Sequence, residues 1–266
     1  MGADTKALRT RIKSVDSTLH LTKAMGLVAS SKIRRASEHM AAAREYSDSL
    51  NSIIRMLSSS RECIKSPYMQ KRDGIKKVIV IAGDRGLAGG YNANVFKEAA
   101  KFSGSEIIPI GKRACERFSK PLVTSEHFSL KDSHDLAKTL CEDFKDGKYS
   151  ELYIVATKYV SMMTQEAFSF KVLPLSAEDA SSGIQAIFEP DEESVLNRAV
   201  LEYVSGIISC CVKESFACEV AARRNAMDSA GKNAKQMISD LTLKYNRARQ
   251  GAITQEITEI VAGSGI

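Results

Sequence analysis

Residues 8–57 read LRTRIKSVDSTLHLTKAMGLVASSKIRRASEHMAAAREYSDSLNSIIRML, and apolar residues recur along this stretch at a regular helical spacing. Taken in steps of four and three from Leu8, fifteen positions fall on one line, and twelve of them are apolar. They are Leu8, Ile12, Val15, Leu19, Thr22, Gly26, Ala29, Ile33, Ala36, Met40, Ala43, Ser47, Leu50, Ile54 and Leu57. A heptad spacing kept over this length predicts a long helix that packs against a partner helix.

The C-terminal segment repeats this spacing and supplies the partner. The Pro and acidic residues of 189–193 are typical of a helix start. The spacing then runs from Leu196, slips near Ala217 and resumes at Met227. A slip of this kind changes the supercoil locally without ending the helix. Because the two segments lie at opposite ends of the chain, we expect a long antiparallel two-helix coiled coil.

The sequence between these helices predicts a small α/β domain. Apolar β-branched runs alternate with helical patterns from residue 75 to residue 175, which is typical of an α/β sheet. Strands are expected at 76–83, 106–110, 152–157 and 168–175, and helices near 92–103, 111–119 and 133–146. The predicted division is an N-terminal coiled-coil helix (1–66), a Rossmann-like α/β head domain (75–175), a linker (176–190) and a C-terminal coiled-coil helix (191–266).

Composition narrows the function classes. The net charge of +6 lies entirely in residues 1–66, which hold 12 Lys and Arg against 6 Asp and Glu. Such a segment suits nucleic acid, anionic lipid, an acidic protein or a solvated helix face. The six cysteines form no CxxC pair, so we expect buried thiols and no metal site. The longest charge-free apolar stretch, 203–212, is too short to span a bilayer, so no membrane insertion is expected.

A glycine-rich segment follows the first predicted strand. Residues 83–90 read GDRGLAGG, at the strand-to-helix turn where nucleotide folds bind phosphate. The spacing matches neither G-x-G-x-x-G nor G-x-x-x-x-G-K-[ST], and no Lys-Ser/Thr pair follows. We therefore interpret the segment as a head-domain contact loop, with Arg85, Gly86, Gly89 and Gly90 as its candidate residues. No catalytic residue and no cofactor is expected.

Both predicted helices carry apolar residues away from the line that joins them. A pair of helices has too little interior to bury them all, so we expect further protein to surround the coiled coil. These residues are Met25, Leu27 and Val28 near the start and Ile253, Ile257, Ile260 and Val261 near the end.

Four parts of the chain resemble the gamma subunit of F-type ATP synthases: LTKAM with VASSKIRRA (21–25 and 28–36), GDRGLAGGYN (83–92), RNAMDSA (224–230) and YNRARQGAITQEITEI (245–260). Gly26 and Leu27 depart from the pattern of that family. The resemblance implies a non-catalytic rotor shaft inside a ring of three alpha and three beta subunits, whose head meets the epsilon subunit and the membrane c-ring. It implies ring contacts at Met25, Arg249, Gln250, Thr254 and Glu256. We expect neither the Cys-bearing insertion of the chloroplast version nor a transit peptide. A peripheral protein on the cytoplasmic face of a bacterial plasma membrane is therefore expected, with the coupling ion left open.

Two alternatives remain at this point. A Rossmann-like nucleotide-binding enzyme with a coiled-coil dimerisation arm predicts saturable nucleotide binding through residues 83–90. A basic coiled-coil scaffold for nucleic acid predicts steeply salt-dependent DNA binding, because such binding releases counterions.

Overall fold

A computed structural model describes residues 2–60, 62–176, 188–189 and 191–263 of the chain. Two helices dominate it: α1 (Gly2–Ser58) at the N-terminus and α5 (Glu192–Gly263) at the C-terminus. The chain divides into two compact units, which are described separately below. Unit 1 consists of Met1–Ser30 and Arg223–Ile266, and unit 2 consists of Ser31–Ala222. Most of the predicted linker, 176–190, lies outside the described residues.

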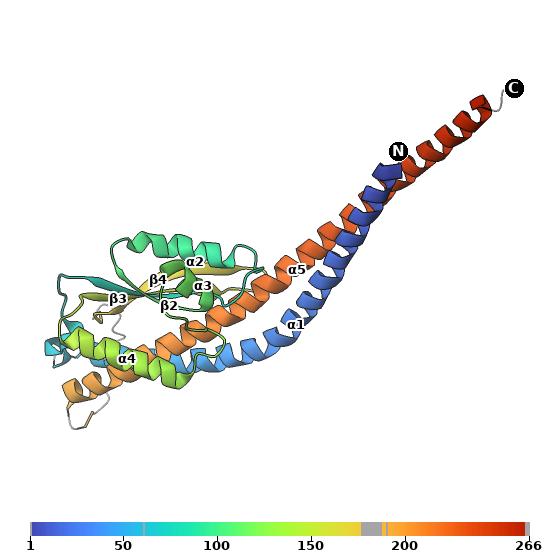
Figure 1. Ribbon diagram of the computed structural model, residues 1–266. Coiled ribbons are helices and arrows are strands. Elements are labelled where there is room, and N and C mark those ends of the chain that lie inside the picture. The colour runs from blue at the N-terminus through green and yellow to red at the C-terminus, as the bar shows by residue number, and fades with distance from the viewer. Residues whose placement is uncertain (1, 61, 177–187, 190, 264–266) are drawn as a thin grey trace. The chain divides into compact units, whose positions relative to one another are not determined.

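In unit 1 the two helices pack side by side and run in opposite directions (Figure 1). A Cβ atom built on Gly26 would lie 3.6 Å from the Cβ of Met227. One built on Gly231 would lie 3.8 Å from Oγ1 of Thr22 and 3.9 Å from Cδ1 of Leu19. As the α1 numbers fall, the α5 numbers rise, which is the predicted antiparallel order. A methyl group at either position would make ordinary van der Waals contacts, so the two helices are in direct contact at both glycines.

Helix α5 extends beyond α1 at the free end of unit 1. Ala252 is the last residue of α5 that is partly covered, and every residue of 253–263 is exposed. At 1.5 Å per residue this single-helix end is about 16 Å long. In Figure 1 the red end of α5 continues past the N-terminus of the chain.

Unit 2 contains a four-stranded mixed sheet in the order β2-β1-β3-β4. The strands are β1 (Lys76–Ile81), β2 (Glu106–Ile110), β3 (Glu151–Tyr159) and β4 (Gln165–Leu173). Strand β1 pairs in parallel with both β2 and β3, and β4 pairs antiparallel with β3. The predicted fold is therefore confirmed: long terminal helices pack together, with a mixed four-stranded α/β insertion between them.

Helices cover both faces of this sheet. Val78 and Val80 face α2 (Tyr91–Ala99) and α3 (Lys112–Phe118). The 3-10 helix η3 (Ala100–Phe102) follows α2 directly. Ile79 and Ile81 face the opposite way, toward α4 (Leu130–Lys145) and the parts of α1 and α5 that belong to unit 2. Figure 1 shows α2 on one side of the sheet and α4 on the other. The 3-10 helices η1 (Cys63–Lys65) and η2 (Pro67–Met69) add Cys63 and Tyr68 to this second core.

The central part of α5 is a core helix of unit 2. No residue of 203–222 is exposed, so this part meets other elements on every side. That environment explains why the heptad spacing slips near Ala217. Within the described chain, α5 is the one helix that is long and apolar enough to cross a membrane by length and composition. Of its most apolar 18 residues, 56 % are already buried in the protein, as in the core helix of a soluble domain.

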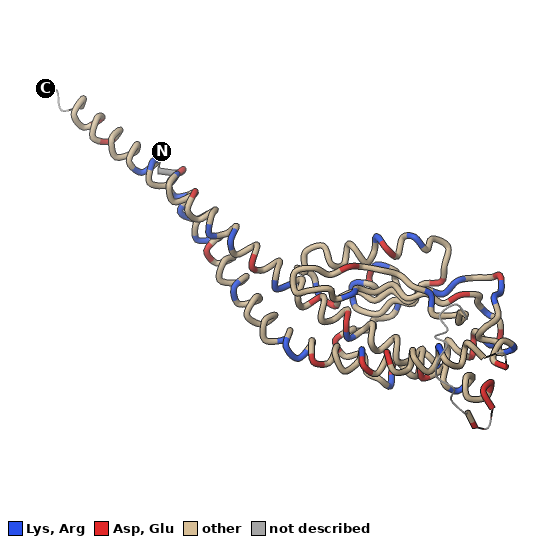
Figure 2. Tube along the Cα trace, turned by 180° about the vertical axis from the view of Figure 1, so that it is seen from behind, with Lys and Arg blue, Asp and Glu red and all other residues tan. Residues whose placement is uncertain are grey.

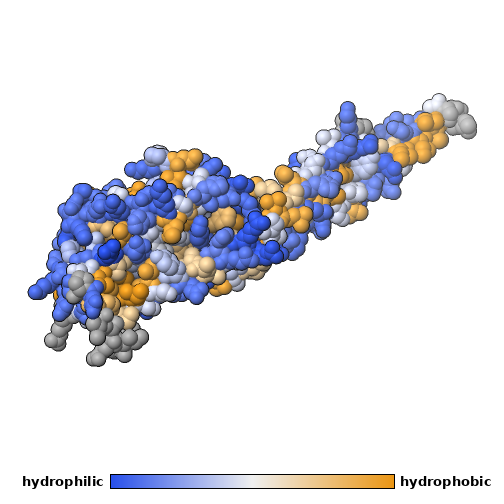
Figure 3. All heavy atoms as spheres, turned by 90° about the horizontal axis from the view of Figure 1, so that it is seen from below, coloured by the Kyte–Doolittle hydropathy of each residue, from blue (hydrophilic) through white to orange (hydrophobic). Residues whose placement is uncertain are grey.

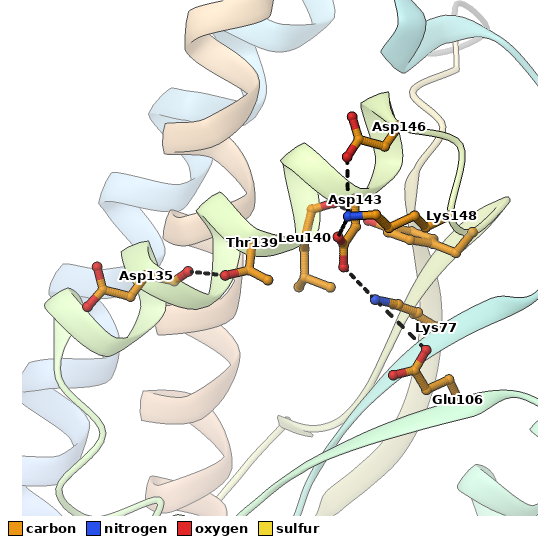
Figure 4. A network of polar contacts seen from close by, with 9 residues as sticks. Lys77, Glu106, Asp135, Thr139, Leu140, Asp143, Asp146 and Lys148 are labelled. Atoms are coloured by element: carbon orange, nitrogen blue, oxygen red, sulfur yellow. Dashed lines mark hydrogen bonds and ion pairs between the residues drawn. The ribbon is translucent and has the colours of Figure 1, made fainter.

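A polar network joins α4 to the start of the sheet (Figure 4). Lys77 Nζ lies 2.8 Å from Oδ2 of Asp143 and 3.8 Å from Oε2 of Glu106. Lys148 Nζ lies 2.7 Å from the other oxygen of Asp143. Hydrogen bonds from these two lysines hold the pKa of Asp143 below its ordinary value. The network therefore fixes the C-terminal end of α4 against β1 and β2.

Candidate functional site

The glycine-rich loop lies at the carboxyl end of β1 and leads into α2. The N–H of Gly83 donates to Oδ1 of Asn92 (3.0 Å), whose amide nitrogen donates to the carbonyl oxygen of Arg85 (3.3 Å). Gly89 has a positive φ of 58°, a conformation that glycine adopts without strain. These bonds give the loop a fixed shape in the position where a phosphate loop would stand.

A carboxylate from α5 fills this loop. Oε2 of Glu219 accepts the N–H of Asp84 and Oε1 accepts the N–H of Arg85, each at 3.3 Å. Glu219 is only 2 % exposed. A Cβ atom on Gly83 would lie 2.7 Å from Cδ of Glu219, so no larger residue fits there without displacement. The amides that bind a phosphate in nucleotide folds are therefore already paired with an anion of the chain itself.

Asp84 fixes the neighbouring loop. Its Oδ1 accepts the N–H groups of Lys112 and Ser125, both at 2.9 Å, and its Oδ2 accepts that of Glu126 at 2.8 Å. Burial by itself would raise the pKa of Asp84, but these three N–H groups outweigh it and hold the pKa below the ordinary value. The carboxylate of Asp84 is therefore a structural anion.

Arg85 and Leu87 form the outer side of the loop. The Arg85 side chain is 65 % exposed, and Leu87 is 64 % exposed. Nη2 of Arg85 lies 3.7 Å from Oε2 of Glu126, whose other oxygen lies 2.5 Å from Nζ of Lys32 on α1. Of the predicted loop residues, Arg85, Gly89 and Gly90 are exposed and Gly86 is half-buried.

A second polar cluster binds α1, α5 and β3 together inside unit 2. Nη2 of Arg44 lies 2.6 Å from Oε1 of Glu214 and donates to the carbonyl oxygen of Tyr159 at 3.2 Å. The N–H of Tyr159 donates to the same Glu214 oxygen at 2.7 Å. The hydroxyl of Tyr91 donates to the carbonyl oxygen of Ser215 at 3.0 Å. Together these bonds fix α5 to the carboxyl end of the sheet.

The residues expected to contact a ring all lie in unit 1. Met25 is half-buried, whereas Arg249, Gln250, Thr254 and Glu256 are exposed on α5. The hydroxyl of Thr254 donates to the carbonyl oxygen of Gln250 at 3.0 Å, a bond within the helix. The ring contacts at these residues stay a prediction.

An exposed apolar surface accompanies them. Figure 3 shows hydrophobic atoms gathered near the free end of α5. The exposed apolar side chains of unit 1 include Leu21, Leu27 and Val28 on α1 and Ile253, Ile257, Ile260 and Val261 on α5. The residues of 253–263 include only two charges, Glu256 and Glu259, in an otherwise uncharged segment (Figure 2).

Sequence reasoning missed Glu219, Asp84 and the pairing of Arg44 with Glu214. One signal was available, because Lys213, Glu214 and Glu219 are the only charges in residues 203–222. A charge in a stretch buried on every side needs a partner. All six cysteines are buried and free, which confirms the predicted state of these thiols. Within the described ranges, no group of three or more His, Cys, Asp and Glu side chains is placed to hold a metal ion.

Comparisons with known proteins give one family. A family model described as ATP synthase matches residues 4–265. The ATP synthase gamma chain of Ruminococcus albus is 40 % identical in an alignment 281 positions long that covers 98 % of each chain. That of Geotalea uraniireducens is 37 % identical in an alignment of the same length, which also covers 98 % of each chain. That of Burkholderia mallei is 38 % identical in an alignment 288 positions long that covers 98 % of this chain and 99 % of the relative.

Solved structures agree in fold. The Euglena gracilis mitochondrial ATP synthase, solved with its c-ring, contains a chain that matches with a TM-score of 0.68 at 17 % identity. The match covers 100 % of this chain and 97 % of that one. A chain from the central stalk and c-ring of the Tetrahymena thermophila enzyme matches with a TM-score of 0.61 at 20 % identity, covering 79 % and 99 %. Because the family model and the bacterial relatives match almost end to end, the chain belongs to the ATP synthase gamma chain family and is the non-catalytic central-stalk rotor subunit of an F-type ATP synthase.

Proposed function

We propose that unit 1 turns inside a ring of three alpha and three beta subunits and transmits rotation to their catalytic sites. The observation that carries this proposal is the uncovered apolar end of α5. Ile253, Ile257, Ile260 and Val261 are 46 %, 57 %, 70 % and 61 % exposed, and their spacing puts them on one side of the helix. An exposed apolar stripe of this kind is typical of a surface that another protein covers.

Polar ring contacts stand beside this stripe. We propose that Met25, Arg249, Gln250, Thr254 and Glu256 contact the ring at defined rotor angles. The exposure of the four α5 residues supports this role, because their side chains are available to a partner. Charged and polar groups next to an apolar surface favour one orientation of a partner over others.

Asymmetry is the physical basis of coupling. Two unequal helices present a different surface in each direction, so three identical beta subunits would meet three different surfaces. Each surface then favours a different conformation of the subunit that it contacts. Turning the coiled coil moves these preferences around the ring, which couples rotation to the binding of nucleotides.

Unit 2 is proposed to receive the rotation. We place the epsilon subunit and the membrane c-ring on this unit, and we propose that the glycine-rich loop, with Arg85, Gly86, Gly89 and Gly90, is a contact loop of the head domain. The bonds of Arg44 and Glu214 support this role, since they fix α1 and α5 to the sheet. The protein would lie on the cytoplasmic face of a bacterial plasma membrane without inserting into it, consistent with the burial of the apolar part of α5.

The assembled complex provides the test. The variants Arg249→Ala and Glu256→Ala, rebuilt into the whole ATP synthase, should lower ATP hydrolysis and ATP-driven proton pumping. The variant Lys244→Ala, which also removes an exposed charge from α5, serves as the matched control and should leave both rates unchanged. Normal rates in both test variants would refute the assigned contacts.

The two alternatives predict different results. A nucleotide-binding enzyme would bind ATP saturably at residues 83–90, where the Glu219 carboxylate already pairs with the loop amides. A nucleic-acid scaffold would bind DNA with a steep dependence on salt. Calorimetry with ATP and a salt-titrated DNA shift on the isolated chain test both, and we expect no binding in either.

A further inference from the structure

We propose that the backbone amides after β1 form an oxyanion-binding site, and that the carboxylate of Glu219 is the built-in occupant of that site. The inference goes beyond the rotor function, since it concerns what unit 2 can bind and what holds α5 to the sheet of unit 2. The ligand class is a small oxyanion, either a carboxylate or a phosphate.

The position of the loop in the sheet is the first argument. Strand β1 has a parallel neighbour on each side, β2 and β3, and the chain crosses from one to the other by way of α3 and α4. In open α/β sheets ligands bind outside the carboxyl ends of the strands at such a point, because the connections there diverge and leave a crevice. Glu219 enters this crevice from α5, an element outside the sheet.

The contacts around the carboxylate are the second argument. Each oxygen of Glu219 accepts one backbone N–H, from Asp84 and from Arg85. On the third side, Gly83 offers no side chain, and a Cβ there would lie 2.7 Å from Cδ and 2.9 Å from Oε2 of Glu219. Two adjacent amides with a glycine beside them form the kind of concave anion site found in phosphate loops.

The loop keeps its shape through bonds that do not involve Glu219. Asn92 holds Gly83 and Arg85, and the carboxylate of Asp84 binds the amides of Lys112, Ser125 and Glu126. Removal of the Glu219 carboxylate should therefore leave the two amides in place. A site that is already organised pays little ordering cost on binding, so a free oxyanion can replace the lost side chain.

The occupant has two consequences. Because Glu219 fills the site, free phosphate and nucleotide phosphates are excluded from this loop. Because Glu219 is part of α5, the same bonds tie that helix to the carboxyl end of β1. In unit 2 the position where an α/β sheet usually binds a ligand therefore holds a side chain of α5, and this contact links the sheet to that helix.

Anion rescue of the full-length chain tests the proposal. The variant Glu219→Ala should lower the melting temperature by about 4–10 °C, since the backbone amides of Asp84 and Arg85 lose their acceptor. Formate should restore at least half of this loss along a saturable curve, while sodium chloride at equal ionic strength should not. Phosphate forms a second arm: rescue by formate alone indicates a site sized for a carboxylate, and rescue by both indicates a general oxyanion site.

Two further variants separate this role from ordinary packing. Glu219→Gln keeps one acceptor oxygen in place, so it should lose less stability and show no rescue by formate. Glu202→Ala removes an exposed carboxylate from the same helix and should show neither effect. In ¹⁵N spectra the amide signals of Asp84 and Arg85 should move in Glu219→Ala and return toward their wild-type positions when formate is added.

Several results would overturn the proposal. These are an unchanged melting temperature in Glu219→Ala, equal rescue by formate and chloride, or amide signals of Asp84 and Arg85 that do not shift when formate is added. If Glu219→Ala folds only in the presence of added anion, refolding should succeed in formate and fail in chloride, and equal failure in both contradicts the site. None of these outcomes bears on the ring contacts, which lie on unit 1.

Discussion

Replacement of Arg44 by Met should destabilise unit 2 through the carboxylate that it leaves behind. The side chain of Glu214 is 12 % exposed, and Arg44 supplies a contact of 2.6 Å to its Oε1. After the substitution the charge of Glu214 would keep only the N–H of Tyr159, at 2.7 Å. Removal of one partner from a buried ion pair costs about 3–5 kcal/mol. Because the Arg44 side chain itself is 38 % exposed, water can reach the carboxylate of Glu214 after the substitution. We therefore expect the free energy of unfolding to fall by about 2 kcal/mol.

A double-mutant cycle separates the pair from other effects of the substitution. Glu214→Gln keeps an oxygen that accepts the N–H of Tyr159, so it should cost about 1 kcal/mol. The double variant should show a coupling energy of about 1 kcal/mol between positions 44 and 214. Arg55→Met, an exposed arginine on the same helix, is the matched control and should change stability by less than about 0.5 kcal/mol.

Urea unfolding followed by tyrosine fluorescence measures these values. The chain has 8 Tyr and no Trp, and all of them except Tyr245 lie within residues 31–222, so the signal reports mainly on unit 2. A loss below about 0.5 kcal/mol in Arg44→Met, or a coupling energy near zero, would refute the argument that the buried carboxylate depends on its arginine.

Further predictions concern other parts of unit 2. Lys77→Met should destabilise the chain in urea, because Asp143 and Glu106 would lose their shared cation; equal midpoints would contradict this. Gly111→Ala should prevent recovery of folded protein, since a Cβ there would lie 2.0 Å from the carbonyl oxygen of Ala82; a soluble variant with native circular dichroism would count against it. The lowered pKa of Asp84 stabilises the fold at pH values above the ordinary pKa of 3.8, and this stability is lost as the pH falls through the pKa of the folded state. Asp84→Asn should therefore weaken the fall of unfolding free energy on the acid side, and parallel pH curves for variant and wild type would contradict this. Burial raises the pKa of Cys141 to about 12 and that of Cys210 to about 11, so the native chain should resist iodoacetamide at pH 7.5 while urea exposes its thiols, and rapid native labelling would be inconsistent with this burial.

Much of the fold could be predicted from local pattern. All fifteen positions of the N-terminal heptad line are buried or half-buried, and the strand expected at 106–110 has those bounds. Helix α4 begins at Leu130, three residues before the expected start. Its capping box uses Ser129 with Asp132, whereas the usual pattern has Glu or Gln at that position. Local signals therefore located the elements but misplaced several of their ends, among them the start of α4, where the cap is unusual, and the start of β4, at Gln165 instead of residue 168.

The candidate site depended on contacts between distant parts of the chain. The spacing of the glycines argued against a phosphate loop, but it could not show that Glu219, more than 130 residues away, fills the loop. The pairing of Arg44 with Glu214 spans 170 positions. Periodicity reports which side of a helix is buried, and it carries no information about which distant group meets a given charge. Such pairings follow only from the packed structure.

Rotation of the assembled complex tests the central claim most directly. With the alpha and beta subunits fixed to a surface and a bead attached to Lys131→Cys, an exposed position of unit 2, ATP should drive the bead in one direction. Its pauses should be spaced by a third of a turn, since three beta subunits are proposed around the shaft. A bead that stays fixed while the complex hydrolyses ATP would contradict the account.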